Sequence, residues 1–231
     1  MARPMARKKP RKRKPKTGPV RPIQRRLKPD QRERMIAQAA VRFFAEHGFE
    51  GKTRELALRL GIAQPLLYRY FPSKQALIDR VYREVFVDPW LPEWLEKLAD
   101  RSRPLKQRLQ EFYIAYAHAS IGHDRVRLYI FAGLKGLDIN ARFLKTLKNR
   151  IFTSVLAEIR HAYRLPPLSK VPVTELETEL IWGLFASIFY IGVRRWIYGL
   201  TVPEDIDRVV ASKVSAMLDG MPKEIARILE G

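Results

Sequence analysis

The sequence contains no cysteine among its 231 residues. This absence excludes disulfide bonds, thiolate metal sites and cysteine nucleophiles, and it fits a reducing cytoplasm. Long apolar runs are also lacking, because the longest uncharged apolar stretch covers the fourteen residues from Leu180 to Val193. A helix that spans a bilayer needs about 20 such residues. We therefore expect a buried helix there, no membrane anchor, and no secretory signal behind the basic N-terminus.

Histidine is scarce and shows none of the spacings used in catalysis. The four histidines lie at positions 47, 118, 123 and 161, without an HExxH pair, and the chain has no nucleophile elbow and no glycine-rich phosphate loop. His47 is predicted on the core face of the first helix. Asp124 and the neighbouring His123 provide too few ligands for a metal site. The sequence therefore predicts a protein that is not an enzyme, with no catalytic residue, no metal and no cofactor.

Acidic residues are few relative to basic ones, and the imbalance is concentrated at the N-terminus. Lysine and arginine number 44 against 24 acidic residues, and residues 1–29 hold 13 of the basic residues, six prolines and no acidic residue. A segment of this composition is predicted to be a disordered basic arm. The arm would follow a DNA backbone or enter a minor groove, or else serve as a solubilising tail. Its candidate DNA contacts are Arg11, Lys12, Arg13, Lys14, Arg25 and Arg26.

From Asp30 onward the apolar residues follow helical periodicity, and no strand pattern or internal repeat is found. Helices are predicted from an N-cap at Asp30 to Gly48, over 53–60 and 64–71, and from 74 to 86 behind Ser73. A proline-marked connection follows from Asp88. Further helices are predicted over 104–121, 124–135, 138–163, 174–199 and 203–219, with breaks at glycine or proline and a short helix near 222–229. The chain is predicted to be all-α, with an N-terminal domain over 30–86 and a larger C-terminal domain over 87–231.

The segment 53–72, TRELALRLGIAQPLLYRYFP, has the residue types that a helix-turn-helix requires. Ala57 is small where the second helix must pack, and Gly61 tolerates a positive φ in the turn. Apolar residues at 56, 60, 62, 67 and 71 would fill the junction between the helices. Helical geometry then turns Gln64, Pro65, Tyr68 and Arg69 outward. In a major groove, Gln64 could bind adenine and Arg69 could bind guanine or phosphate.

Residues 36–82 contain the strings AAVRFFAEHGFE, ELALRLGIA, LLYRYFPSKQALI and RVY. In this region the chain resembles the TetR-family DNA-binding domain. The resemblance implies phosphate contacts from the hydroxyls of Tyr68 and Tyr70 and from Lys74 at a helix N-terminus. It also implies phosphate contacts from Lys52 and Thr53. Ala63 stands where the family usually has a serine or threonine cap.

The resemblance also implies a C-terminal domain that dimerises and binds a small molecule. Helix 174–199 is apolar nearly all round, so it is predicted to contribute Leu184, Ile188, Ile191 and Trp196 to a dimer interface with 203–219; the alternative is a purely intramolecular core. Aromatic residues recur through the middle helices. They are predicted to line a ligand pocket, or alternatively to form core: Phe112, Tyr116, Tyr129, Phe131, Phe152 and Trp182.

Together these features predict a sequence-specific DNA-binding regulator that acts in the cytoplasm as a homodimer. The resemblance implies a repressor that a small hydrophobic or aromatic molecule releases from a palindromic double-stranded operator. The alternative is a non-specific basic nucleic-acid-binding helical protein without an inducer, which would share the arm but would not need the face formed by Gln64 and Arg69.

Overall fold

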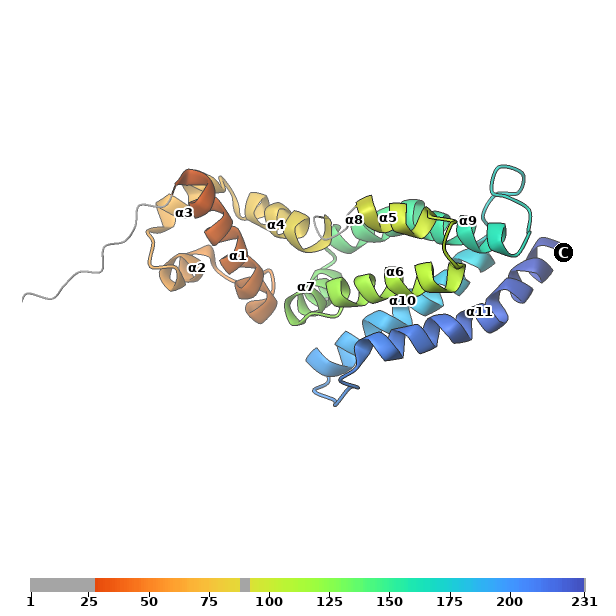
Figure 1. The fold of residues 1–231 in the computed structure, drawn as a ribbon. Helices are drawn as coiled ribbons and strands as arrows, with labels where there is room; N and C mark the ends of the chain where they lie inside the picture. Colours follow the sequence, from red (N-terminus) through yellow and green to blue (C-terminus); the bar gives the residue numbers. More distant parts are fainter. Residues whose placement is uncertain (1–27, 88–91, 231) are drawn as a thin grey trace, which may run out of the picture.

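A computed structural model describes residues 28–87 and 92–230, and these residues form helices and connecting turns without a β-strand. The predicted all-α fold is confirmed. Figure 1 shows an elongated molecule in which a small N-terminal group of helices leads through α4 into a larger C-terminal bundle. The basic arm over residues 1–27 and the connection at 88–91 lie outside the described residues. The division at residues 30–86 and 87–231 remains a prediction.

The N-terminal group comprises α1 (Pro29–His47), α2 (Thr53–Arg59), α3 (Gln64–Tyr70) and α4 (Lys74–Tyr82). The chain continues from α4 into the π-helical segment η1 (Arg83–Val87). Gly48 ends α1 with a φ of 70°, which favours glycine, and Ser73 caps α4 by accepting a hydrogen bond from the Ala76 amide. Asp30 lies in the first turn of α1 and is not its N-cap, because the preceding Pro29 already begins the helix.

The C-terminal bundle consists of α5 to α11, with a second π-helical segment, η2, between α8 and α9. Helices α6 and α10 lie in its centre, and α11 runs along one side of the bundle (Figure 1). The bounds are α5 Pro92–Ala99, α6 Leu105–Ser120, α7 His123–Leu134, α8 Ile139–Thr146, η2 Leu147–Phe152, α9 Thr153–Ala162, α10 Glu175–Trp196 and α11 Ile206–Glu230.

Two sequence-based expectations about this bundle are wrong. The segment after residue 92 is a helix, α5, because Pro92 occupies its first turn, where proline removes no helical hydrogen bond. Helix α11 also continues through Gly220 and Pro222, where a break was expected. Pro222 leaves the Leu218 carbonyl without its helical donor, and the Tyr163 hydroxyl lies 3.5 Å from that oxygen.

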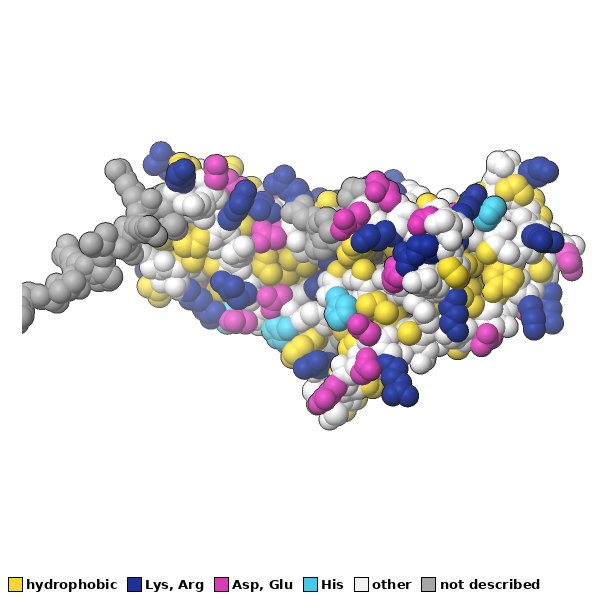
Figure 2. All heavy atoms as spheres, in the orientation of Figure 1, with side chains coloured by type: hydrophobic (Ala, Val, Ile, Leu, Met, Phe, Trp, Pro, Cys, Tyr) yellow, Lys and Arg dark blue, Asp and Glu magenta, His cyan; other side chains and the backbone are white. Residues whose placement is uncertain are grey.

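Charged side chains of both signs are spread over the two parts of the molecule in Figure 2. The face shown is therefore mixed in sign, and 13 of the 44 basic residues but none of the 24 acidic residues lie in the N-terminal arm sequence. Helix α10 is long and apolar enough to cross a membrane, by length and composition only, and half of its most apolar window is buried inside the molecule. Its buried side packs against α6, α7 and α11, which is typical of a core helix.

Candidate nucleic-acid interface

The helix-turn-helix formed by α2 and α3 is held by a small apolar junction. Leu56, Ala57 and Leu67 are buried between the helices, together with Phe71 at the end of α3. Gly61 adopts a φ of 63°, and the Ile62 amide donates to the Ala57 carbonyl at 3.0 Å, which closes the turn. The residues that the spacing placed in this junction therefore fix the angle at which α3 leaves the domain.

The outward face of α3 presents most of the predicted DNA-binding residues. Pro65 and Arg69 are exposed and Tyr68 is 36% exposed, whereas Gln64 and Tyr70 are partly buried. Gln64 and Pro65 form the first turn of α3, which Ala63 precedes without a side-chain cap. This arrangement gives one helix face a polar amide, a phenol and a guanidinium.

Lys52 and Lys74 lie at the N-terminal ends of the two helices that flank α3. Lys52 precedes the first residue of α2 and is exposed, while Lys74 is the first residue of α4 and is partly buried. Unpaired amides at helix N-termini favour anions, so both positions suit a phosphate.

Thr53 differs from its predicted role, because it is only 6% exposed. Its Oγ1 lies 2.9 Å from the Tyr68 hydroxyl and accepts a hydrogen bond from Gln64 Nε2 at 3.1 Å. The hydroxyl therefore contacts two other candidate residues within the protein and is not presented to a phosphate. The pairing spans fifteen residues of sequence, so it depends on how α3 packs against α2.

His47 is also placed differently from the prediction, since it is exposed and does not lie in the core. Its ring packs on Phe43 with centroids 4.9 Å apart, and Arg59 donates to its Nε2 at 2.5 Å. Arg59 also contacts Glu46 at 2.6 Å, and this hydrogen bond holds the pKa of the Glu46 carboxyl below its ordinary value. The cluster joins the end of α1 to α2.

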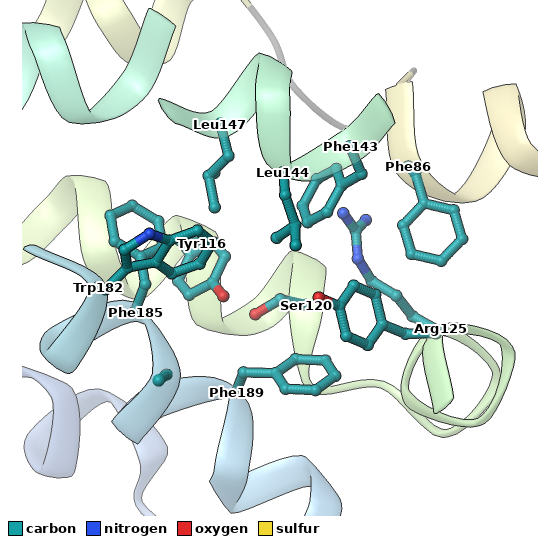
Figure 3. Close-up of a pocket in the computed structure, with 12 residues that line it drawn as sticks. Phe86, Tyr116, Ser120, Arg125, Phe143, Leu144, Leu147, Trp182, Phe185 and Phe189 are labelled. Atoms are coloured by element: carbon teal, nitrogen blue, oxygen red, sulfur yellow. The ribbon is translucent and has the colours of Figure 1, made fainter. Parts of the chain in front are cut away.

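A cavity of ≈110 Å³ lies in the C-terminal bundle. In Figure 3, Tyr116 and Ser120 direct their hydroxyl groups into the same space, and the Arg125 guanidinium lies near Phe86 and Phe143. Tyr116, Tyr129 and Trp182 line the cavity as predicted, but Phe112, Phe131 and Phe152 do not. The remaining lining residues are Phe86, Ser120, Arg125, Phe143, Leu144, Leu147, Phe185, Ala186 and Phe189.

The polar groups of the cavity are strongly affected by burial. Burial lowers the pKa of Arg125 to about 10, so the guanidinium still carries its charge at neutral pH. Its charge lies 5.0 Å from the Phe86 ring centroid and 5.3 Å from that of Phe143. Burial raises the pKa of Tyr116 to about 12, so this phenol is a neutral hydrogen-bonding group. The cavity thus combines apolar aromatic walls with a small polar region.

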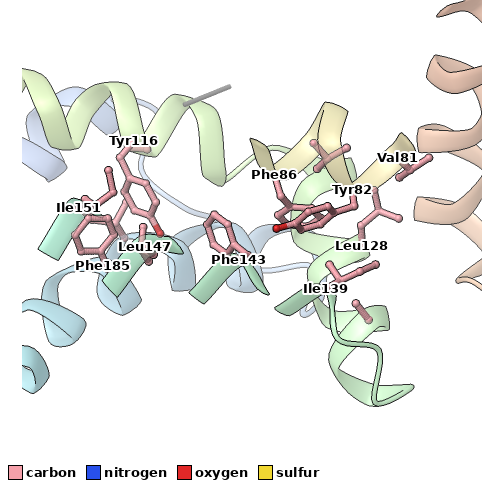
Figure 4. Close-up of a cluster of buried hydrophobic side chains, with 14 of the residues drawn as sticks. Val81, Tyr82, Phe86, Tyr116, Leu128, Ile139, Phe143, Leu147, Ile151 and Phe185 are labelled. Atoms are coloured by element: carbon pink, nitrogen blue, oxygen red, sulfur yellow. The ribbon is translucent and has the colours of Figure 1, made fainter. Parts of the chain in front are cut away.

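A continuous apolar core connects the cavity to the N-terminal helices. Figure 4 shows it extending from Val81 and Tyr82 on α4 through Phe86 and Phe143. The Phe86 ring lies 5.9 Å from that of Tyr82 and 5.5 Å from that of Phe143, between centroids. Displacement of the cavity walls would therefore act directly on the end of α4.

Helix α7 forms a second connection between the cavity and the N-terminal helices. One of its faces supplies Arg125 and Tyr129 to the cavity lining. From another face, Arg127 Nε donates to the Ala45 carbonyl at 2.5 Å, near the end of α1, and the Phe131 ring lies against Gly48. A basic group at a helix C-terminus also interacts favourably with the helix dipole.

Three of the four residues predicted for a dimer interface are buried within the chain itself. Ile188 is 0% exposed, and Leu184 and Ile191 are also buried. Trp196 donates from Nε1 to the Ile121 carbonyl at 2.8 Å. Gly192 permits this intramolecular packing, because a Cβ atom there would lie 3.0 Å from the Ile121 backbone. Ile188 and Ile191 therefore belong to the core of the chain itself, and their assignment to a partner surface is corrected, whereas Leu184 also lines a groove between α10 and α11.

A different stripe of α10 faces outward. Residues 176, 180, 183, 187 and 190 recur at helical spacing, with Leu176 62% exposed and Tyr190 49% exposed. An open groove between α10 and α11 continues this surface. It is lined by Leu180, Gly183, Leu184, Ser187, Lys213, Ala216, Met217, Asp219, Gly220, Met221, Lys223, Glu224 and Arg227.

The chain is similar to known bacterial regulators over most of its length. The "HTH-type transcriptional repressor KstR2" of Mycobacterium tuberculosis is 25% identical over 197 residues, which cover 82% of this chain and 92% of that protein. A TetR-like transcriptional regulator from Rhodococcus sp. RHA1 has a TM-score of 0.60 at 18% identity, covering 84% of this chain and 100% of that one. A putative transcriptional regulator from Pseudomonas aeruginosa PAO1 has a TM-score of 0.61 at 17% identity, covering 87% and 95%.

Residues 36–81, which extend from α1 into α4, match the family described as "Bacterial regulatory proteins, tetR family". The match contains both helices of the helix-turn-helix and the serine-capped start of α4. The structural likeness extends the shared fold into the C-terminal bundle. Residues 36–81 therefore form a TetR-type DNA-binding domain with a helix-turn-helix, in a chain that is similar to TetR-family transcriptional regulators over most of its length.

Proposed function

We propose that the protein is a homodimeric repressor that binds a palindromic operator and is released from it by a small molecule. The observation that carries this proposal is the outward face of α3, where Gln64, Tyr68 and Arg69 project from a rigid helix-turn-helix. The similarity to a mycobacterial transcriptional repressor supports the direction of regulation. Such a regulator would act in the bacterial cytoplasm, where the DNA is located.

The polar residues on α3 divide into base-reading and phosphate-binding groups. The Gln64 amide can donate to and accept from adenine, and Arg69 can bind guanine or a phosphate. Tyr68 and Tyr70 would donate hydroxyl protons to phosphates, with Lys52, Pro65 and Lys74 lying along the same contact surface. The N-terminal arm would add contacts that depend on salt but carry no sequence information.

The groove between α10 and α11 supports a second copy of this chain as the dimer partner. Its floor contains small and apolar side chains, including Gly183, Ala216 and Met217, which permit close helix approach. Its lining carries both signs of charge, with Lys213 and Arg227 beside Asp219 and Glu224. A surface with both signs can be self-complementary across a two-fold axis. The dimer would place two α3 helices about one DNA turn, roughly 34–36 Å, apart.

The cavity limits the size of the effector. A dry cavity of roughly 150 Å³ accommodates benzene, so the ≈110 Å³ here suits a compact ligand of about the size of one ring. Its aromatic walls favour an apolar body, and the hydroxyls of Tyr116 and Ser120 suit a single polar substituent. Binding would bias α4, which continues into the cavity-lining segment η1, and α7, which contacts both the cavity and the end of α1.

The alternative, a general polyanion binder, is distinguished by substituting the α3 face. In a Tyr68→Ala/Arg69→Ala variant, a specific regulator loses affinity for its selected duplex but keeps weak, salt-sensitive DNA binding. The matched control is Lys148→Ala/Arg150→Ala, two exposed basic residues of η2 in the C-terminal bundle. Fluorescence anisotropy at two salt concentrations measures both affinities. Equal DNA binding by the two variants and wild type would favour the general binder.

A further inference from the structure

The hydroxyl group of Thr53 links α2 to the DNA-facing side of α3. Its Oγ1 accepts from Gln64 Nε2 at 3.1 Å and lies 2.9 Å from the Tyr68 hydroxyl oxygen. Thr53 is the first residue of α2 and is buried, whereas Tyr68 is exposed and Gln64 is partly exposed. One buried hydroxyl therefore contacts two side chains that project toward the proposed DNA surface.

The chemistry of these groups fixes the direction of the bond from Gln64 and favours one direction for the bond between Thr53 and Tyr68. An amide nitrogen can only donate, so the bond from Gln64 occupies an acceptor site on Thr53. A buried hydroxyl whose own proton lacks an acceptor is costly, and the Tyr68 oxygen lies within reach. Donation from Thr53 to Tyr68 would satisfy this proton, and the phenolic proton of Tyr68 would then be directed away from Thr53.

This hydrogen-bond direction suits the groups that DNA presents. Phosphate oxygens only accept, so an outward phenolic proton on Tyr68 is suited to a phosphate. Anchoring one N–H of the Gln64 amide leaves its other N–H and its Oε1 free, which is the donor–acceptor pair that the adenine edge requires. Holding both side chains before DNA arrives also reduces the entropy lost on binding.

We propose that Thr53 is a positioning residue for operator recognition: it orients Gln64 and Tyr68 through hydrogen bonds and does not itself touch DNA. The inference rests on the proposed function, because it assumes that the α3 face reads sequence. It replaces the phosphate contact expected for Thr53 from the family resemblance.

The test compares wild type with Thr53→Val, which keeps the branched shape and removes the hydroxyl. Full-length wild type first enriches duplexes from a random pool. Each protein is then titrated with an enriched duplex and with a scrambled duplex of the same composition. Losing two hydrogen bonds should lower the ratio of the two affinities about tenfold in Thr53→Val, and Thr53→Ser should restore it.

Two comparisons separate positioning from a general structural role. Thr178→Val removes another buried threonine hydroxyl, which donates to the Thr174 carbonyl at 2.9 Å in the C-terminal bundle, and it should leave the ratio unchanged. In a Gln64→Ala/Tyr68→Phe background, Thr53→Val should cause little further loss of the ratio, because the side chains that it orients are already altered.

The possible outcomes separate failure of the positioning role of Thr53 from failure of the proposed function. If wild type enriches a motif but Thr53→Val keeps the full affinity ratio, the positioning role is refuted while sequence-specific binding stands. A full loss that persists in the Gln64→Ala/Tyr68→Phe background would also refute it, because Thr53 would then act by another route. If wild type enriches no motif, the proposed function and this inference both fail.

Discussion

The buried ion pair between Arg160 and Glu177 should dominate the stability of the segment that leads into α10. Neither side chain is exposed, and Arg160 donates to the two carboxylate oxygens at 2.8 and 2.6 Å. Arg160 also donates to the carbonyls of Pro166 and Val171 at 3.0 and 2.7 Å. The carboxylate additionally accepts from the Thr174 amide, which completes the cap of α10.

We predict that Glu177→Gln destabilises the protein by about 3 kcal/mol. The substitution keeps the shape but leaves the buried Arg160 charge without a counter-charge, and it replaces one acceptor oxygen with a donor. Breaking a buried pair from one side typically costs about 3–5 kcal/mol, and the remaining amide oxygen places the estimate at the lower end. For a chain of this size the midpoint of thermal unfolding should fall by roughly 6–12 °C.

The assay is thermal unfolding followed by circular dichroism at fixed protein concentration, because dimerisation makes the midpoint concentration-dependent. The matched control is Glu175→Gln, an exposed residue in the same first helical turn. It removes only an interaction with the helix dipole, worth up to about 1 kcal/mol. A midpoint for Glu177→Gln no lower than that of Glu175→Gln would refute the reasoning.

Three further predictions concern oligomerisation, the cavity and acid stability. Gly183→Arg should yield folded monomers by light scattering, because a Cβ atom at position 183 would have no neighbour within 4 Å in the chain and the position lines the proposed dimer groove. Ser212→Arg, outside the groove, should remain dimeric. Benzyl alcohol should raise the thermal unfolding midpoint of the wild type by binding in the cavity. Ser120→Leu should fill the cavity and abolish this stabilisation while retaining DNA binding. Stabilisation of the variant by benzyl alcohol would contradict the assignment of the cavity as the ligand site. Burial raises the pKa of Glu177, but hydrogen bonds from Arg160 and Thr174 outweigh it and lower the pKa below 4.5. Its stabilising contribution is therefore present above about pH 4.5 and lost as pH falls through the folded-state pKa, so acid unfolding of Glu177→Gln should be less steep in pH.

The helix-turn-helix could be predicted from sequence because its determinants are local. The requirements for Ala57 and Gly61 follow from two short helices that cross within twenty residues, and the structure places both residues as expected. The role of Thr53 could not be predicted in the same way. Its partner Tyr68 lies fifteen residues away, and only the packing of α3 against α2 shows that the two hydroxyls meet.

The C-terminal bundle was predictable in its helices but less so in its surfaces. Helix α10 is apolar nearly all round, so periodicity could not show that Ile188 faces the core while Tyr190 faces outward. The cavity depends on where six segments cross. Arg125 enters it from the same helix as the predicted Tyr129, at a position that the aromatic pattern did not mark. The continuity of α11 through Pro222 was likewise not predictable from local signals, because the Tyr163 hydroxyl that lies 3.5 Å from the Leu218 carbonyl comes from a residue distant in sequence.

The most direct test of the central claim is selection of binding sites by the full-length protein from a random duplex DNA pool. A salt concentration of about 0.15 M screens much of the attraction of the basic arm, which leaves the helix-turn-helix to discriminate among sequences. A two-fold dimer predicts enrichment of a palindrome whose half-sites lie about one helical turn apart. Enrichment of no motif, with binding that declines smoothly as salt rises, would contradict sequence-specific regulation and favour a general polyanion binder.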